Sequence, residues 1–450
     1  MSYLLVPLGV STGDATVWIG AVNEPVDPPP PLILEYDLQH QPLDPAGWSR
    51  WVSEDRGYTL LFQRLTFTGL TPRSRYPLRL RSGNEIKAEG EVTTLPASLP
   101  TLTEKPFTLL LGSCFSELQD QGGSVGATYF RLPAGVRPDV KILCGDQVYL
   151  DAPWHHYLRP WKYSREELES RFFDIYLRAW RQSGMGSGFQ QLLKSGANYF
   201  TSDDHEFWNN APNKAVYVRN TWSDSGRDEW LQLARRFYET FQPTGSTASF
   251  AVGPLSFFIA DTRVDRSKDQ TDFMPSPAFG QLEKWIQSLP GPGVLVIGQP
   301  LFAEKAGWKG NFTDWHLPDY RQYESLARAI SASRQPIVIL TGDVHFGRVA
   351  RSTLPSGVPL IEVISSPMSL VDKKAGGKWD PPPGVFPATE APGVVKRPIQ
   401  DTGYQITENH FMTLEFSAVG ARVQMAAKSW PIVQGGAAPI PKEVIQPILL

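Results

Sequence analysis

The chain has 450 residues, of which 41% are hydrophobic and 20% charged, and its formal net charge is −3. These values are typical of a globular protein of one to three domains, and the net charge gives no basic footprint that would indicate a nucleic-acid partner. No apolar run reaches the length of a transmembrane helix, and two cysteines cannot build a disulfide framework.

The N-terminus lacks a charged segment followed by a long apolar one, so we expect a cytoplasmic protein without a membrane partner, or a secreted or periplasmic one if a leader was removed.

Residues 1–100 are predicted to be all-β. The expected strands are residues 15–19, 32–36, 60–67, 76–81 and 85–93. Leu70, Pro72 and Tyr76 have the spacing of a tyrosine corner, and Trp18 would be a buried strand tryptophan. This region resembles a fibronectin type III domain, an Ig-like β-sandwich, and we interpret it as a docking or shielding module.

Residues 101–450 are predicted to form a second domain of the α/β class, because buried strands alternate with helices. The expected strands are residues 107–112, 140–144, 197–201, 256–260, 294–298 and 336–341. The expected helices are residues 164–180, 189–194, 228–241, 279–289 and 320–333. Strands return at 360–364, 411–416 and 422–425. Between them, residues 373–399 are rich in proline and glycine and indicate a long surface loop.

Polar side chains follow each of the six buried strands of this domain. In chain order they are Ser113, Cys114, Asp146, Tyr149, Asp203, Asp204, His205, Asn209, Asn210, Asp261, Arg263, Gln299, Asp343 and His345. Because loops that follow the strands of one sheet converge on one edge, we expect these groups to meet. That edge would hold at least three carboxylates, which cannot all stay ionised unless cations lie among them.

Asp146 and Tyr149 follow the strand at 140–144, and their spacing lets both side chains turn toward one point. The alternative is a strand end closed by an Asx-turn, with Tyr149 in the core. A tyrosinate ligand implies a strongly Lewis-acidic ion, most simply ferric iron, because phenol has a pKa near ~10. A thiolate from Cys114 would add charge to the same ion, the alternative being a small buried hydrophobic residue. Cys144 lies within the strand and is interpreted as core.

A second ion at this edge would see only oxygen ligands, which suit calcium, magnesium or manganese better than zinc. The candidate ligands are Asp146 as a bridge, Asp204, Asn210 or Asn209, Gln299 and Asp343.

Five motifs together resemble the set found in PhoD-type alkaline phosphatases, which are metallophosphoesterases related to purple acid phosphatases. The motifs are GSC at 112–114, GDQVYLD at 145–151, DDHEFWNN at 203–210, ADTR at 260–263 and TGDVHFGR at 341–348. The resemblance covers residues 105–420, and the N-terminal sandwich also fits the family's layout. It implies a four-layer α/β/β/α metallophosphatase sandwich and a centre containing Fe³⁺ and one or two Ca²⁺ ions, with Mn²⁺, Mg²⁺ or Zn²⁺ as alternatives at the second position.

The resemblance also implies roles for individual residues. The iron ligands would be Cys114, Asp146, Tyr149 and His345. The ligands of the second ion or ions would be Asp146, Asp204, Asn210 and Asp343. His205 would lie near the leaving group and Arg263 over the phosphoryl oxygens. In the implied mechanism two ions clamp the phosphate, a metal-bound hydroxide attacks phosphorus, and His205 donates a hydrogen bond or proton to the leaving oxygen.

Two features depart from the family. The twin-arginine leader of its secreted members is absent, and the segment that usually reads W-D-x-Y-P is here residues 315–320, with His316 in the place of the aspartate. The change at His316 bears on substrate preference. His155 and His156 are interpreted as solvent-facing loop residues, the alternative being that they line the mouth of the site.

We therefore expect hydrolysis of a phosphomonoester, a phosphodiester or both, with a small-molecule phosphate ester as the substrate and no nucleic acid as a structural partner. Two other classes compete: a catalytically silent PhoD-like binding protein, and a zinc hydrolase of another ester class. Every expected strand-end group is present, which argues against the silent protein. The H-x-H-x-D-H cluster of such zinc hydrolases is absent, which argues against the other.

Overall fold

The computed structural model describes residues 2–25, 27–53, 57–157, 162–181, 188–311, 313–370, 378–434 and 437–450. The chain begins with an all-β region of eight strands. These are β1 (Ser2–Val10), β2 (Ala15–Val22), β3 (Ile33–Tyr36), β4 (Gln39–Pro42), β5 (Ser49–Ser53), β6 (Tyr58–Phe67), β7 (Arg75–Ser82) and β8 (Glu85–Thr93). They form two four-stranded sheets, in the orders β1-β2-β6-β5 and β4-β3-β7-β8.

The N-terminal region is held by one predicted hydrogen bond and by aromatic contacts with the rest of the chain. Tyr76 Oη accepts from the backbone N–H of Thr71 at 2.8 Å, which is the bond that the tyrosine-corner spacing predicts. The rings of Trp51 and Phe237 stack with their centroids 4.3 Å apart. Trp18 is buried, as predicted. The β1-β2-β6-β5 sheet therefore packs on helix α4 (Asp224–Phe241) of the second region.

Two larger sheets follow. The six-stranded sheet has the order β11-β10-β9-β21-β22-β23 and contains β9 (Phe107–Gly112), β10 (Val140–Cys144), β11 (Ala197–Thr201), β21 (His410–Val419), β22 (Arg422–Pro431) and β23 (Lys442–Leu449). The seven-stranded sheet has the order β12-β13-β14-β15-β17-β16-β20 and contains β12 (Thr247–Val252), β13 (Leu255–Ala260), β14 (Gly293–Val296), β15 (Ile337–Thr341), β16 (Gly347–Thr353), β17 (Pro359–Ile364) and β20 (Gln400–Ile406). Each sheet combines parallel and antiparallel pairs.

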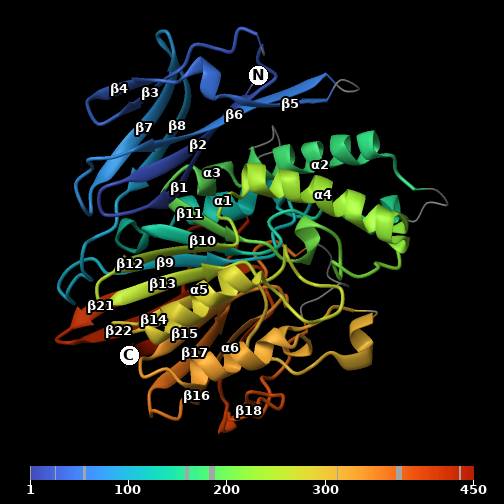
Figure 1. Ribbon diagram of the computed structural model, residues 1–450. Coiled ribbons are helices and arrows are strands. Elements are labelled where there is room, and N and C mark those ends of the chain that lie inside the picture. The colour runs from blue at the N-terminus through green and yellow to red at the C-terminus, as the bar shows by residue number, and fades with distance from the viewer. Residues whose placement is uncertain are drawn as a thin grey trace.

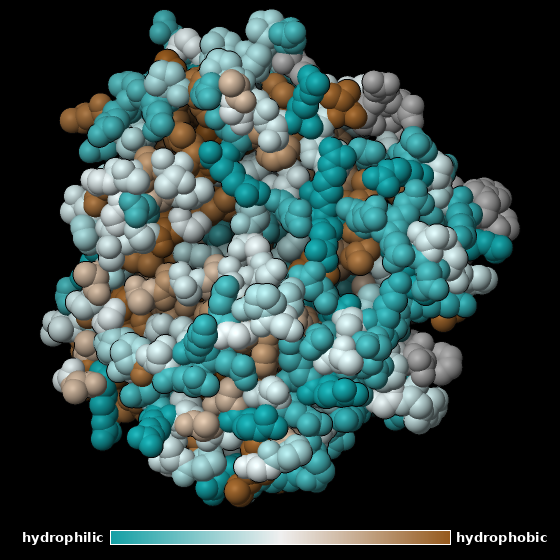
Figure 2. Space-filling model, in the orientation of Figure 1, coloured by the Kyte–Doolittle hydropathy of each residue, from teal (hydrophilic) through white to brown (hydrophobic). Residues whose placement is uncertain are grey.

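Helices cover the outer faces of the two sheets (Figure 1). Besides α4 they are α1 (Ser124–Phe130), α2 (Arg165–Trp180), α3 (Gln190–Leu193), α5 (Ser276–Gln287) and α6 (Gln322–Ser331). Ser164 and Glu167 form the capping box that the sequence predicts at the start of α2. The outward faces of α2 and α4 are largely hydrophilic (Figure 2).

The alternation of side chains along the strands explains how the sheets stack. Leu109 and Leu111 of β9 belong to one apolar cluster with Val294 of β14, so these faces of the two sheets meet. Leu110 points the other way, into a cluster with residues of α2 and α4. Leu295 of β14 likewise lies in a cluster with residues of α5 and α6. Buried strands with apolar residues on both faces are typical of sheets covered on both sides.

The predicted sequence of an all-β region followed by an α/β region is present. The pattern did not predict several elements, among them β1, β4, β5, β12, β16, β23 and α1. In the predicted loop at 373–399, residues 373–377 lie outside the described chain, and β18 (Val385–Phe386) pairs with β19 (Arg397–Pro398). No helix in the described part of the chain combines the length and apolarity that a membrane crossing requires.

Candidate metal centre

The predicted site residues follow strands of two sheets, not of one sheet as the sequence pattern indicated. β9, β10 and β11 belong to the six-stranded sheet, whereas β13, β14 and β15 belong to the seven-stranded one. The loops meet because the sheets stack face to face. Cys114, after β9, places its Sγ 3.3 Å from the carbonyl oxygen of Asp343, after β15. Ser202, after β11, donates its backbone N–H to Asp261, after β13, at 2.8 Å.

Five residues of the predicted site have a left-handed backbone. Their φ angles are +56° for Cys114, +57° for Asp146, +68° for Asn210, +70° for Asp343 and +58° for His345. A non-glycine residue adopts this region only at a cost in free energy. Such strain at five converging positions indicates that the loops are shaped to aim side chains and not to maximise stability.

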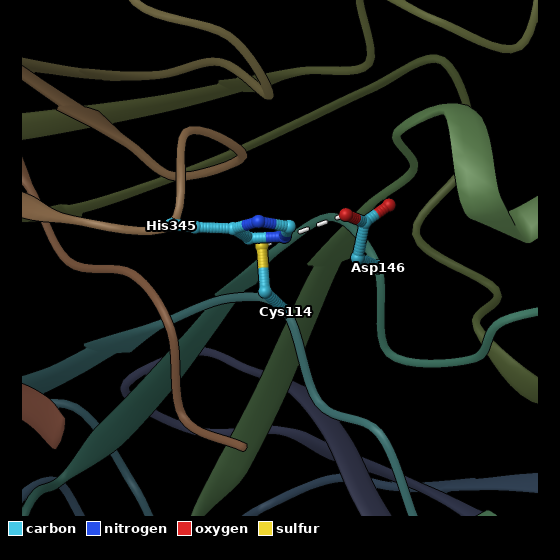
Figure 3. Close-up of side chains that lie close together, drawn as sticks. All are labelled: Cys114, Asp146 and His345. Atoms are coloured by element: carbon cyan, nitrogen blue, oxygen red, sulfur yellow. Dashed lines mark hydrogen bonds between the residues drawn. The ribbon is translucent and has the colours of Figure 1, made fainter. Parts of the chain in front are cut away.

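A first cluster unites the residues that the family resemblance assigns to iron. One ligand atom each of Cys114, Asp146 and His345 lies within 4.8 Å of the others (Figure 3). Cys114 Sγ is 3.5 Å from Asp146 Oδ2, and Tyr149 Oη is 3.5 Å from His345 Nε2. A thiol, a phenol, an imidazole and a carboxylate thus face one point.

Two further clusters extend the centre. Asp146, Asp204 and His205 form one, so Asp146 is shared with the first cluster, as expected of a bridge. Asp203, Asp314 and Asp343 form the other. Asp203 lies within a predicted motif, but it was not predicted as a ligand, and Asp314 is absent from the prediction altogether.

The electrostatics of these clusters favour a bound cation if the groups are to ionise. Burial, followed by neighbouring carboxylates, raises the pKa of Asp146 and Asp203 well above the usual range and that of Asp343 to about 7. Burial, followed by nearby acidic groups, also raises the pKa of Cys114 and of Tyr149. These shifts favour the protonated forms in the absence of a cation, whereas metal ligation requires the ionised forms. The donor set therefore fits a metal centre.

Asn210 is oriented as an oxygen ligand would be. Its backbone N–H donates to Asp204 Oδ2 at 2.8 Å, and its Nδ2 donates to the carbonyl oxygen of Gly310 at 3.1 Å. These bonds leave Oδ1 buried without a hydrogen-bond partner in the described chain. A buried amide oxygen without a partner is unfavourable unless a cation lies beside it. Of the two asparagines considered, Asn210 rather than Asn209 has this arrangement.

Gln299 and Arg263 lie in one polar chain with groups that the sequence did not identify. Both terminal nitrogens of Arg263 donate hydrogen bonds to the Asp314 carboxylate, each at 2.9 Å. Asp314 Oδ2 also accepts from Gln299 Nε2, and Gln299 Oε1 accepts from Arg266 at 2.6 Å. Both ends of the Gln299 amide are therefore occupied, and its role as a metal ligand stays a prediction. Arg263 also lies 3.2 Å from Asp204 Oδ2.

His205 is held by a carboxylate behind it. Its Nδ1 is 2.7 Å from Asp151 Oδ1, and because a carboxylate accepts, Nδ1 carries the hydrogen. Asp151 is buried and also accepts from Tyr217 Oη at 2.6 Å. Although burial alone lowers it, the carboxylates of Asp151 and Asp204 hold the pKa of His205 well above its usual range. Nε2 faces the centre, 3.9 Å from Asp204 Oδ1. The motifs contain Asp151, but their spacing gave it no role.

Glu206 joins the loops after β10 and β11. Its carboxylate accepts the backbone N–H groups of Asp146, Gln147 and Asp203 at 2.9, 2.7 and 2.8 Å. The side chain is fully buried, and burial raises its pKa to about 7. Glu206 therefore fixes the position of Asp146 from behind, a role that its place in DDHEFWNN did not reveal.

A cavity of about 580 Å³ adjoins the centre. Asp343 and Gln299 line one end of it, and His316, Lys305 and Lys309 line its wall. The volume is that of a small-molecule binding pocket. By contrast, the His156 ring contacts Arg171, its carbonyl oxygen accepts from the Tyr163 hydroxyl, and it lines a separate surface hollow.

The fold is shared with two solved phosphatases. The chain matches no protein-family model and no curated protein. It is similar to the structure of PhoD, with a TM-score of 0.62 and 15% identity over 98% of this chain and 92% of that one. It is also similar to the purple acid phosphatase PPD1 from yellow lupin (Lupinus luteus) seeds, with a TM-score of 0.55 and 12% identity over 99% of this chain and 74% of that one. The resemblance to PhoD-type phosphatases is thereby confirmed at the level of the fold.

Proposed function

We propose that this chain, which has the fold of PhoD, is a metal-dependent phosphoric ester hydrolase acting on small-molecule phosphomonoesters, phosphodiesters or both. The observation that carries the proposal is the convergence of Cys114, Asp146, Tyr149 and His345, from loops far apart in the chain, around one point. A catalytically silent relative would be free to lose such groups. The carboxylates beside them would supply oxygen ligands for a second cation, and phosphoryl transfer by paired cations needs two such ions.

The donor set favours Fe³⁺ beside Cys114, Tyr149 and His345, because thiolate and phenolate are anionic ligands that a strongly Lewis-acidic ion stabilises. Ca²⁺ fits the oxygen ligands at Asp204, Asn210 and Asp343, with Mn²⁺, Mg²⁺ or Zn²⁺ as alternatives. Ions bound at such positions draw charge from the phosphoryl oxygens and lower the pKa of water.

The chain's own residues then supply orientation and proton transfer. We propose that His205 Nε2 donates to the leaving oxygen, since Asp151 fixes the ring through Nδ1. Arg263 has five N–H donors, of which Asp314 takes two. The others lie beside carboxylates, with Nε 3.4 Å from Asp203 Oδ1 and a terminal nitrogen 3.2 Å from Asp204 Oδ2. We propose that these donors serve the phosphoryl oxygens when cations occupy the carboxylates, and offset the charge that develops there.

The architecture supports the same family. We propose that the two stacked sheets with their helices form the four-layer α/β/β/α sandwich of metallophosphatases. The N-terminal region would be a fibronectin III-like domain, with the boundary between the two domains near residue 100. The two four-stranded sheets and the Tyr76 hydrogen bond support that assignment.

Elemental analysis combined with two assays tests the proposal. We expect iron with calcium, and hydrolysis of p-nitrophenyl phosphate, bis-p-nitrophenyl phosphate or both. Stoichiometric zinc with turnover of another ester class would favour the zinc hydrolase. Metal-bound protein without phosphatase turnover would favour the silent binding protein and contradict the proposal.

A further inference from the structure

The cavity beside the centre is walled by a loop of fixed shape, residues 304–319, of which residue 312 lies outside the described chain. The carboxylate of Asp319 accepts the backbone N–H groups of Ala306, Gly307 and His316 at 3.0, 3.1 and 2.9 Å. A buried or half-buried carboxylate that gathers three backbone donors holds a loop in one conformation. The side chains that this loop presents to the cavity are therefore pre-positioned.

This loop is tied to the metal centre. Asn210 Nδ2 donates to the carbonyl oxygen of Gly310, so a predicted metal ligand and the loop are directly bonded. The cavity reaches the centre because Asp343, a member of one acidic cluster, lines its end. An ester whose phosphoryl group lies at the centre would project its alcohol part into this cavity.

Another part of the cavity wall is fixed by a buried cation. Arg348 is buried and donates to Glu362 at 2.9 Å, to the carbonyl oxygen of Phe302 at 2.8 Å and to that of Asp380 at 3.1 Å. These bonds join the segment at 380–384 to the sheet. Arg348 therefore shapes the cavity, and its ion pair with Glu362 offsets its charge.

The loop presents to the cavity two lysine ammonium groups that form no ion pair within the described residues. Lys305 and Lys309 are exposed, and no ion pair engages either ammonium group within the described ranges. Two acids, Glu304 and Asp380, line the same cavity and are not paired with the lysines. His316 donates from Nδ1 to the carbonyl oxygen of Glu304 at 2.7 Å, which leaves Nε2 for a ligand.

We propose that this cavity binds the alcohol part of the phosphate ester, and that Lys305 and Lys309 select alcohols that carry a second anionic group. The inference rests on the proposed function for the position of the phosphoryl group. A second phosphate or phosphonate at the far end of a short alcohol can receive charge-assisted hydrogen bonds from both ammonium groups. His316 lines the same cavity.

The experiment compares two non-hydrolysable ligands that differ only in the distal anion: propylphosphonate and propane-1,3-bisphosphonate. Their affinities for the full-length, metal-loaded protein are measured by isothermal titration calorimetry. We expect the bisphosphonate to bind more tightly, and the ratio of the two affinities to fall about tenfold in the double variant Lys305→Ala/Lys309→Ala. The matched control Lys284→Ala, at an exposed position in α5, leaves the ratio unchanged.

Two acid variants test the sign of the effect. Glu304→Gln and Asp380→Asn remove like charges and should raise the preference for the bisphosphonate, more so at low salt. An unchanged ratio in the lysine double variant would overturn the inference. If that variant still hydrolyses p-nitrophenyl phosphate, only the cavity assignment fails. A lysine-dependent preference in a wild-type protein that hydrolyses no phosphate ester would instead contradict the proposed function and keep the anion-binding cavity.

Discussion

The N-terminal β region and the metal-centre edge use the left-handed backbone in opposite ways. In the N-terminal region it occurs at Asn23, Asp37 and Arg73, all of them exposed turn residues. At the centre it occurs at buried or half-buried positions, Cys114 and Asp146 among them, whose side chains are polar. Turns adopt this conformation cheaply, especially at Asn and Asp, whereas a buried Cys or Asp adopts it only if something else compensates.

The two regions also differ in how well their buried polar groups are satisfied by hydrogen bonds. In the N-terminal region the Tyr76 hydroxyl meets its backbone partner, and the aromatic rings pack on α4. At the centre, the amide oxygen of Asn210 is buried without a hydrogen-bond partner in the described residues, and Asp203, whose Oδ1 lies 3.4 Å from Arg263 Nε, shares its cluster with two further carboxylates. Bound cations would compensate these groups. Substitutions at the centre should therefore lower turnover, whereas substitutions in the N-terminal region should lower the free energy of unfolding.

The largest effect is expected at Asp146, which belongs to two ligand clusters. Replacing Asp146 with Asn should abolish metal content and phosphatase turnover together, because one carboxylate would serve both halves of the centre. Elemental analysis and the p-nitrophenyl phosphate assay check this. Turnover that survives the loss of metal would show that the centre does not perform the chemistry.

His205→Ala should lower turnover about 10²–10⁴-fold while the metals remain bound. The reason is that the ring would donate to the leaving oxygen rather than ligate. Metal content and kcat are measured on the same preparation. Loss of metal in this variant would make His205 a ligand.

Asp151→Asn should lower turnover less, by about 10–100-fold, because it disturbs the orientation of His205 without removing the ring. The loss should be greater for alkyl esters than for nitrophenyl esters, since a poor leaving group depends more on proton donation. Tyr217→Phe removes one donor to the same carboxylate and should have a smaller effect of the same kind. Equal losses for both ester types would indicate that Asp151 acts only on folding.

The smallest functional effect is expected in the N-terminal region. Tyr76→Phe removes the hydroxyl that accepts from Thr71 and should lower the free energy of unfolding by about 1 kcal/mol, with turnover unchanged. Chemical denaturation and the phosphatase assay provide the two values. A large fall in turnover at full stability would show that the two regions are coupled in catalysis.

The sequence predicted the parts of the molecule that local patterns encode. Largely apolar runs identified β9 and β10, and the residues that follow them identified Cys114 and Asp146. Strand β1 was missed because its apolar run contains Pro7 and Gly9, which interrupt an alternating pattern.

Other parts of the site depend on contacts that no local pattern encodes. Asp314 meets Arg263 across 51 positions of the chain, and Glu206 gathers backbone N–H groups from a loop 59 and 60 positions away. The pairing of His205 with Asp151 joins residues 54 positions apart. Such groups are identified only once the strands of each sheet are paired, because the partners lie on loops after neighbouring strands.

The central claim is that the buried groups from Cys114 to His345 enclose cations, and element-specific anomalous diffraction from crystals of the metal-loaded protein tests it most directly. We predict an iron peak about 2.0–2.5 Å from Cys114 Sγ, Asp146 and His345, and a second ion beside Asp204 and Asn210. A folded protein whose only ions lie elsewhere, with Cys114 and Asp146 uncoordinated, would contradict the account.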